Sequence, residues 1–370
     1  MALELADILR EYGAAYRQKY ADKLLPSHRQ TMWAIERCRT QALGGQLYGC
    51  PSCGEFQYSY HSCRNRHCPK CQHEQTQDWL ETQRELLLPV PYFMLTFTLP
   101  SELRDLASRN QKLIYALLFH ASAQATQKLA QDPRYIGGQI GLVGVLHTWT
   151  RNLFYHPHVH YLAPAGGLGP QGQWRPARNH FFLPVKALSK LFRAAFRRAL
   201  QNTALFPRIP EQVWRKDWVV HCKPVGNGLA ALKYLAPYIH RVAISNRRLI
   251  SIQHRGSMET SQVTFQYRAS DTGQLKLCTL SVENFLHRFL QHILPHGFVK
   301  VRYYGFFGPT LRPRLSQLQN YLGKTIAPQQ PDEIHQDTTQ TEPHQKIICP
   351  TCGQPMLFQR DLLPNACLSP

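Results

Sequence analysis

Two Cys-x-x-Cys pairs constrain this chain more than any other feature of its sequence. Cys50-Pro-Ser-Cys53 precedes Cys68-Pro-Lys-Cys71, with fourteen residues between the pairs. Each pair can form a tight turn that directs two thiolates to one point, and two such turns complete a tetrahedral Zn²⁺ site. Because four cysteine ligands leave no open position on the metal, the sequence predicts that Cys50, Cys53, Cys68 and Cys71 hold a structural zinc ion.

A third pair, Cys349-Pro-Thr-Cys352, lies near the end of the chain. One pair provides half of a site, and its nearest possible partners in the sequence are His344 and Cys367. Metal binding by this tail therefore stays open. The eleven cysteines are an odd number and are clustered, which argues against a secreted scaffold of disulfides. We expect a cytoplasmic protein whose clustered thiols bind metal.

The chain also carries a large positive charge. It has 43 Lys and Arg residues against 23 Asp and Glu residues, a formal net charge of +20 at pH 7. A polyanion is the expected partner of such a chain, and nucleic acid is the commonest one. An anionic membrane surface is the alternative, but the sequence has no apolar run of about 18 residues that could span a bilayer.

The hydrophobic patterns predict a chain that mixes helices and strands. Helical spacing of apolar residues predicts helices near the N-terminus and over 72–88, 103–129, 185–200, 228–241 and 283–293. Aromatic and β-branched runs predict strands at 92–99, 140–146, 156–163, 218–221, 248–252 and 298–304, and a hairpin over 263–280. We expect an α+β fold with a zinc-binding domain at 1–90, a main domain at 91–325, and a linker with a Cys-bearing tail at 326–370.

Alternate histidines mark one of these strands. In His156-Pro-His158-Val-His160, side chains that alternate across a sheet place His158 and His160 on one face. Protonated neighbours would repel one another, so adjacent imidazoles are favourable when they share a cation. The pattern predicts that His158 and His160 bind a divalent ion, Mg²⁺ or Mn²⁺, that activates phosphate oxygens. The third ligand stays open, with an oxygen ligand, His156, or His147 on the preceding strand as candidates.

Two tyrosines follow at helical spacing. Tyr234 and Tyr238 are four residues apart, so they share a face of the predicted helix, although Pro237 makes that shared face approximate. A phenol is a weak nucleophile near neutral pH and needs a metal ion or a base. Packing of two aromatic rings is the plainer interpretation of the spacing alone.

Two groups of basic residues lie beside these features. The first group is within the second Cys pair and just before it, and the second follows the tyrosines. Lysine and arginine neutralise phosphates, so the sequence predicts that both groups bind DNA. The residues are Arg64, Arg66 and Lys70 in the first group and Arg241, Arg247 and Arg248 in the second.

In combination, these motifs resemble the HUH endonuclease superfamily, and within it the rolling-circle transposases of the insertion sequence 91 family. The resemblance extends over most of the chain. It rests on HSCRNRHCPKCQ at 61–72, HPHVHYLAPAGGL at 156–168, KYLAPYIHRVAISNRRL at 233–249 and FLQHILPHGFVKVRYYGFFG at 289–308. The Cys stretch and the His–Tyr combination are specific together, whereas each alone is not.

The resemblance implies a fold and an activity. The implied core is an antiparallel sheet flanked by helices, similar to a ferredoxin-like or RNA-recognition fold, after a zinc-binding domain that helps to recognise transposon ends. The implied reaction is metal-dependent nicking of single-stranded DNA. His158 and His160 match the metal-binding pair, and Tyr234 and Tyr238 match the nucleophiles that form a 5′-phosphotyrosine bond before strand transfer.

The same resemblance implies a bacterial protein that acts close to the nucleoid. Unwinding of DNA would need host machinery, since no GxxxxGK[ST] pattern is present. The main alternative is a non-catalytic zinc-ribbon regulator that binds DNA, which explains the charge and the cysteines but not the histidines and tyrosines. A zinc hydrolase built on His158 and His160 is a second alternative, although it lacks an HExxH helix or a catalytic carboxylate beside the pair.

Overall fold

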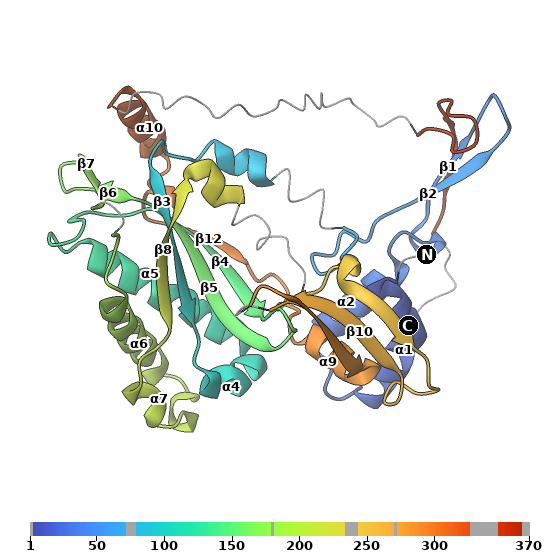
Figure 1. The fold of residues 1–370 in the computed structure, drawn as a ribbon, viewed down its shortest axis with the longest axis horizontal. Helices are drawn as coiled ribbons and strands as arrows, with labels where there is room; N and C mark the ends of the chain where they lie inside the picture. Colours follow the sequence, from blue (N-terminus) through green and yellow to red (C-terminus); the bar gives the residue numbers. More distant parts are fainter. Residues whose placement is uncertain are drawn as a thin grey trace.

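The computed structural model describes residues 3–71, 79–178, 181–233, 243–269, 272–325 and 347–364. Helices and antiparallel sheets are both present, which confirms the predicted α+β class. The helices are α1 (Leu5–Lys19), α2 (Pro26–Arg37), α4 (Arg104–Arg109), α5 (Gln111–Ala130), α6 (Val185–Gln201), α7 (Gln212–Arg215), α9 (Val282–Leu290) and α10 (Pro313–Thr325). Figure 1 shows a larger lobe, a smaller lobe and, apart from both, a small β-sheet.

Within the described residues, the strands belong to four sheets. They are β1 (Gly45–Gly49), β2 (Phe56–Tyr60), β3 (Pro91–Thr98), β4 (Leu142–Trp149), β5 (Tyr155–Pro164), β6 (Gly166–Leu168), β7 (Trp174–Pro176), β8 (Val220–Asn227), β9 (Leu249–Gln253), β10 (Gln262–Arg268), β11 (Leu275–Ser281), β12 (Val301–Tyr304) and β13 (Leu357–Leu362). The larger lobe is built on a five-stranded sheet with the order β12-β4-β5-β3-β8. Every neighbouring pair in it is antiparallel.

One face of this sheet is covered by helices. Phe97, Val159 and Tyr161 point to that face, and they pack with buried residues of α5 and α6 in one apolar core. Figure 1 shows these helices along one side of the sheet. Ring contacts such as Phe97 to Phe192, with centroids 5.2 Å apart, connect the sheet directly to α6.

The opposite face is covered over part of its length. Met94, Val145 and Leu162 pack there in a second apolar cluster that also contains Ala231 and Leu232. Residues of α10 complete this cluster. Beyond it, the same face carries the histidines of β4 and β5, so the apolar cover ends where the polar site begins.

The helix predicted over 103–129 is wrong as a single element. The structure divides it into α4 and α5, with Asn110 between them at φ −131° and ψ 41°. Both the backbone N–H and the side chain of Asn110 donate to the carbonyl oxygen of Leu106, at 3.1 and 3.0 Å, so the polar groups of Asn110 satisfy the end of α4. Among the residues that the structure describes, no helix combines the length and the apolar character that crossing a membrane requires.

The smaller lobe joins segments that are far apart in the sequence. It contains α1, α2 and α9 and the three-stranded sheet β11-β10-β9. Its core brings Leu9 and Met32 from the N-terminal helices together with Phe265 of β10 and Phe285 of α9.

The small separate sheet combines the β1–β2 hairpin, near the N-terminus, with β13, near the C-terminus. β13 pairs with β1, and β1 pairs with β2, in a three-stranded antiparallel sheet. Figure 1 shows this C-terminal segment beside the β1–β2 hairpin. The predicted domain boundaries at 90 and 325 stay a prediction. Contacts connect the two sides of each boundary, since α1 and α2 pack with β10 and α9, and β13 pairs with β1.

Gly305 allows a test of the close packing at the end of β12. Its φ is +60°, and a β-carbon there would overlap with the carbonyl oxygen of Ile140. Gly297 has a similar φ of +69°, but a β-carbon there would meet no atom within 4 Å. We expect Gly305→Ala to lower the free energy of unfolding by about 3 kcal/mol or more, and Gly297→Ala by about 1–2 kcal/mol. Urea unfolding measures both, and equal losses would contradict the role of the overlap.

Candidate functional site

Three histidines of the central sheet come together on its partly covered face. His147 lies on β4, and His158 and His160 lie on β5. Their ring nitrogens offer one ligand atom each, and these atoms all lie within 4.8 Å of one another. The residues are 5%, 9% and 9% exposed, respectively, so the group is buried. Strand register produces it, since His147 lies directly opposite His158 and such partners share a face.

His156, the other histidine considered as a third ligand, does not belong to this group. The β4–β5 ladder shifts register after His147, so that His156 and Pro157 together oppose one residue of β4. Pro157 has no N–H to donate to the ladder, which explains a bulge at this position. The ring of His156 instead accepts a hydrogen bond from Arg104 on α4, at 2.8 Å.

Hydrogen bonds orient His158 and His160 on β5. Nδ1 of His158 lies 2.6 Å from the carbonyl oxygen of His156, and since a carbonyl can only accept, this nitrogen carries the proton. The lone pair of His158 is therefore on Nε2. Nδ1 of His160 lies 2.9 Å from the hydroxyl oxygen of Thr96 on β3. Bonds of this kind fix ring orientation in metal-binding histidines.

Burial keeps these imidazoles neutral. It lowers the pKa of His158 to about 3, and the neighbouring His160 adds to the effect. Burial, together with the charge of Lys223, lowers the pKa of His160 to about 4. Since metals bind the neutral form of imidazole, the group is able to accept a divalent ion at neutral pH.

The histidines line a pocket of about 650 Å³ where the two lobes meet. The larger lobe contributes the histidines and Trp149, and the smaller lobe contributes residues of β10 and the segment before β9. Three arginines also line it, Arg151, Arg248 and Arg268. One guanidinium group can donate hydrogen bonds to two phosphate oxygens at once, so this pocket suits a phosphate group beside a metal ion.

Two of these arginines also hold the pocket together. Arg248 donates to the carbonyl oxygens of Gln266 at 2.9 Å and Ala243 at 3.3 Å, and also to that of Arg151. Arg151 donates in turn to the carbonyl oxygen of Arg268 at 3.0 Å. Arg248, predicted as a DNA contact, therefore has a structural role in addition to its position in the pocket.

The predicted nucleophiles, Tyr234 and Tyr238, lie outside the described residues, as does Arg241. The chain on both sides of them is described. Leu232 packs on the sheet face that bears the histidines, and Ala243 lines the histidine pocket. The described residues on the two sides of 234–242 therefore border the histidine group from different directions, Leu232 from the sheet face and Ala243 from the wall that the smaller lobe contributes.

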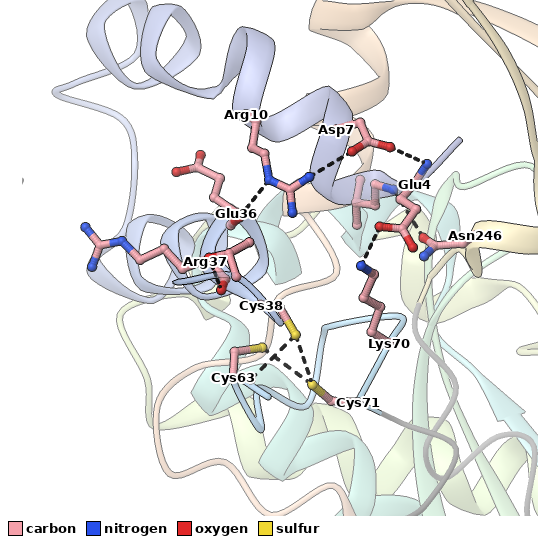
Figure 2. A network of polar contacts seen from close by, with 12 residues as sticks. Glu4, Asp7, Arg10, Glu36, Arg37, Cys38, Cys63, Lys70, Cys71 and Asn246 are labelled. Atoms are coloured by element: carbon pink, nitrogen blue, oxygen red, sulfur yellow. Dashed lines mark hydrogen bonds and ion pairs between the residues drawn. The ribbon is translucent and has the colours of Figure 1, made fainter. Parts of the chain in front are cut away.

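The remaining predicted DNA contacts have different surroundings. Arg64 and Arg247 are exposed. Arg66 donates to a backbone carbonyl of the larger lobe at 2.8 Å, and Lys70 forms an ion pair of 2.6 Å with Glu4 (Figure 2). The charges of Arg66 and Lys70 thus take part in contacts within the protein, and DNA binding by these four residues stays a prediction.

Eight of the described cysteines form two groups, and the first joins Cys38 with Cys63, Cys68 and Cys71. The Sγ atoms of Cys38 and Cys71 are 3.4 Å apart, and those of Cys63 and Cys71 are 3.6 Å apart. Figure 2 shows these three sulfurs pointing toward one another. Hydrogen bonding from Cys63 lowers the pKa of the Cys38 thiol, which favours a thiolate. Zinc–sulfur bonds of about 2.3 Å in a tetrahedron place sulfurs about 3.8 Å apart, so the group fits zinc.

The second group joins Cys50 and Cys53 with Cys349 and Cys352. The Sγ atoms of Cys50 and Cys352 are 3.4 Å apart, and those of Cys53 and Cys349 are 3.5 Å apart. These separations also fit a tetrahedral zinc site. The tail therefore completes the site that the first Cys-x-x-Cys pair begins.

The two halves of this group are turns of the same kind. In each turn the N–H of the first cysteine donates to the carbonyl oxygen five residues later, at 2.8 and 2.9 Å. Gly54 and Gly353 follow the second cysteines with φ of +74° and +72°, a conformation that glycine adopts without strain. The partners expected from sequence proximity, His344 and Cys367, lie outside the described residues.

The structure corrects the predicted grouping of four cysteines. Cys50 and Cys53 lie in one group, and Cys68 and Cys71 lie in the other, so they do not converge on one metal ion. The spacing of a Cys-x-x-Cys pair describes one turn and says nothing about which turn lies opposite. Proximity in the sequence therefore does not identify which two Cys-x-x-Cys turns share a metal ion.

One signal in the sequence could have identified the second group. Residues 50–55 and 349–354 repeat the pattern Cys-Pro-Ser/Thr-Cys-Gly-Glu/Gln, which is typical of two equivalent turns. Cys38 and Cys63 of the first group have no such signal, because each is a single cysteine separated from the Cys68–Cys71 turn.

Cys352→Ser distinguishes the two groupings. We expect the purified protein to hold two structural zinc ions and this variant to hold one, because the second group loses a ligand. Cys278→Ser, outside both groups, should retain both ions. Metal analysis by mass spectrometry gives the counts. An unchanged zinc content in Cys352→Ser would contradict a site that includes the tail.

The buried histidines predict a loss of stability in acid. An unfolded histidine titrates near pH 6.5, whereas His158 in the folded protein has a pKa of about 3. Between these values the unfolded chain binds a proton that the folded chain does not, so stability falls as pH falls from 6.5. We expect His158→Gln to reduce the loss of unfolding free energy between pH 7 and pH 5 by about 2 kcal/mol, without added metal. Denaturant unfolding at both pH values checks this, and exposed His120→Gln should change nothing.

Comparison with known proteins gives the family. The family model described as "Transposase zinc-binding domain" matches residues 8–99, and the one described as "Putative transposase" matches residues 141–314. The first range contains Cys38, Cys50 and both pairs predicted at the start, and the second contains the three histidines. No solved structure matches the chain.

Two relatives agree with these models. The chain is 40% identical over 377 residues to "Putative transposase y4qJ" of Sinorhizobium fredii, an alignment that covers 95% of this chain and 93% of that protein. It is 30% identical over 297 residues to the transposase for insertion sequence element IS801 of Pseudomonas savastanoi pv. phaseolicola, with 75% and 69% covered. The chain therefore belongs to the insertion sequence 91 family of transposases, DNA-cleaving enzymes with an N-terminal zinc-binding domain.

Proposed function

We propose that this transposase nicks single-stranded DNA at the ends of its element, with a tyrosine as nucleophile and a divalent ion at the histidine group. One observation carries the proposal. The three histidines share a buried face of the sheet, and of the described residues that flank the segment containing Tyr234 and Tyr238, Leu232 packs on that face and Ala243 lines the histidine pocket. The transposase relatives support DNA as the substrate.

His147, His158 and His160 would hold the ion. Within the described residues this group contains imidazoles and no carboxylate, so it fits Mn²⁺ better than Mg²⁺, which prefers oxygen ligands. When bound, the ion withdraws negative charge from the phosphate oxygens. Thr96 holds the imidazole of His160 in place, and the backbone carbonyl of His156 holds that of His158.

The tyrosine carries out the covalent step. The phenol of Tyr234 or Tyr238 gives up its proton to water as its oxygen attacks the phosphorus, an O–P bond forms, and the bond from phosphorus to the 3′ oxygen breaks. The 3′ oxygen leaves as a hydroxyl after it takes up a proton, and the 5′ phosphate remains on the tyrosine. This bond retains the energy of the broken linkage, so the same strand can be joined to a target.

Two tyrosines would allow one strand to stay attached while a second strand is cut, as rolling-circle transposition requires. The basic wall of the pocket would bind phosphates next to the cut. Host machinery would separate the DNA strands, because the sequence carries no GxxxxGK[ST] motif of its own. We place the reaction in the bacterial cytoplasm, beside the nucleoid.

Variants of the two motifs test the proposal. His158→Ala and His160→Ala should each slow the cleavage of a single-stranded end oligonucleotide by about 100-fold or more with Mn²⁺, because the ion loses a ligand. The double variant Tyr234→Phe with Tyr238→Phe should form no covalent protein–DNA adduct. Gel electrophoresis under denaturing conditions measures both products.

His120→Ala provides the control, because His120 is exposed on α5, the helix that covers the other face of the sheet. This variant should cleave at the wild-type rate. A double tyrosine variant that still forms the adduct would exclude both tyrosines as nucleophiles. Tight DNA binding without cleavage by the wild-type protein, on either strand, would favour the non-catalytic regulator.

A further inference from the structure

A polar strip extends from the histidine group to the edge of the central sheet. β8 is the last strand on that side. Its residues alternate, since Val220 is buried and Cys222 half-buried, whereas His221 and Lys223 are exposed. Alternate residues of a strand point to opposite faces, so His221 and Lys223 share one face.

Strand register places this pair on the face of the histidine group. His160 on β5 lies opposite Thr96 on β3, and Thr96 lies opposite His221 on β8. Directly opposite residues in antiparallel strands share a face. Neighbouring strands are about 4.8 Å apart, so the backbone of His221 lies about 10 Å from that of His160. Lys223 follows in the next row, opposite Met94.

The two threonines of β3 complete the strip. Thr96 and Thr98 lie between β5 and β8, opposite His160 and His158, and both are partly exposed. A strand of DNA that leaves the histidine group across β3 would therefore meet hydroxyl groups first and the side chains of β8 next. Its course ends at β8, the edge strand of the described sheet.

We infer that Lys223 and His221 form a binding site for a DNA phosphate adjacent in the strand to the phosphate that is cut. This inference rests on the proposed function, because it continues the same strand across the sheet. The ammonium group of Lys223 and a ring N–H of His221 can both donate to phosphate oxygens. The site would hold the strand in register with the histidine group, so both residues act in positioning.

A lysine at an edge strand can also prevent pairing with another chain. That role requires a charge at the edge, but it requires neither a row shared with His160 nor a histidine beside the lysine. The two roles predict different results for DNA binding, which a salt titration can measure.

The test uses the full-length, zinc-bound protein and a fluorescent single-stranded oligonucleotide, without added Mn²⁺. We expect Lys223→Gln to weaken binding about threefold to tenfold, equally for an end sequence and a scrambled sequence, because a phosphate contact carries no sequence information. The plot of log affinity against log salt should become less steep by about 0.7, the value for one phosphate of a single strand. Lys223→Arg should restore both values, and His221→Ala should weaken binding without the change in slope that the lysine causes.

Lys190→Gln is the matched control, because Lys190 is an exposed lysine on α6, on the other side of the sheet. It should leave affinity and slope unchanged. Unchanged affinity and slope in Lys223→Gln would overturn the phosphate site, and so would a weaker affinity with an unchanged slope. The binding measurement needs no cleavage. A wild-type protein that fails to cleave would therefore contradict the proposed function without deciding this site.

Discussion

The antiparallel pairing of β5 with β4 on one side and β3 on the other determines where the polar groups of the pocket lie. Register with β4 brings His147 opposite His158, and register with β3 brings Thr96 opposite His160. A shift of one residue would turn each of these side chains to the helix-covered face. Phe97 and Tyr161 pack with α5 and α6 on that face, so the apolar core fixes the register on which the polar face depends.

The two cysteine groups act at a larger scale, because each connects segments that the sequence separates. The first ties the end of α2 to the loop before residue 72, beside a core that also contains α9 and β10. The second ties the tail to the β1–β2 hairpin. A metal that binds such a group stabilises the folded state by its full binding free energy, since the unfolded chain has no preformed site. The smaller lobe supplies one wall of the histidine pocket, so its stability bears directly on the site.

Local patterns in the sequence were sufficient to predict most of the described strands and the shared sheet face of His158 and His160. Alternation and apolar periodicity depend on neighbours within one element, and a single sequence contains them. The bulge at Pro157 excludes His156 from the histidine group, and the break between α4 and α5 lies at one residue, Asn110. The apolar periodicity of an element predicts neither detail. The cysteine partners of the second group lie about 300 residues apart in the chain, and no spacing rule reaches that far.

The net charge of +20 gave the first indication of a nucleic-acid partner, but net charge does not identify the residues that bind it. Lys70 forms an ion pair with Glu4, and Arg66 and Arg248 donate to backbone carbonyls. Charges held in this way cost less to bury than isolated ones and contribute to the fold, although they still add to the long-range field that attracts DNA. Direct contact with phosphates requires side chains that face an open path from the histidine group. Edge strand β8 and the pocket wall provide that path, so the arrangement of the strands narrows the set of candidate contacts far more than the number of basic residues does.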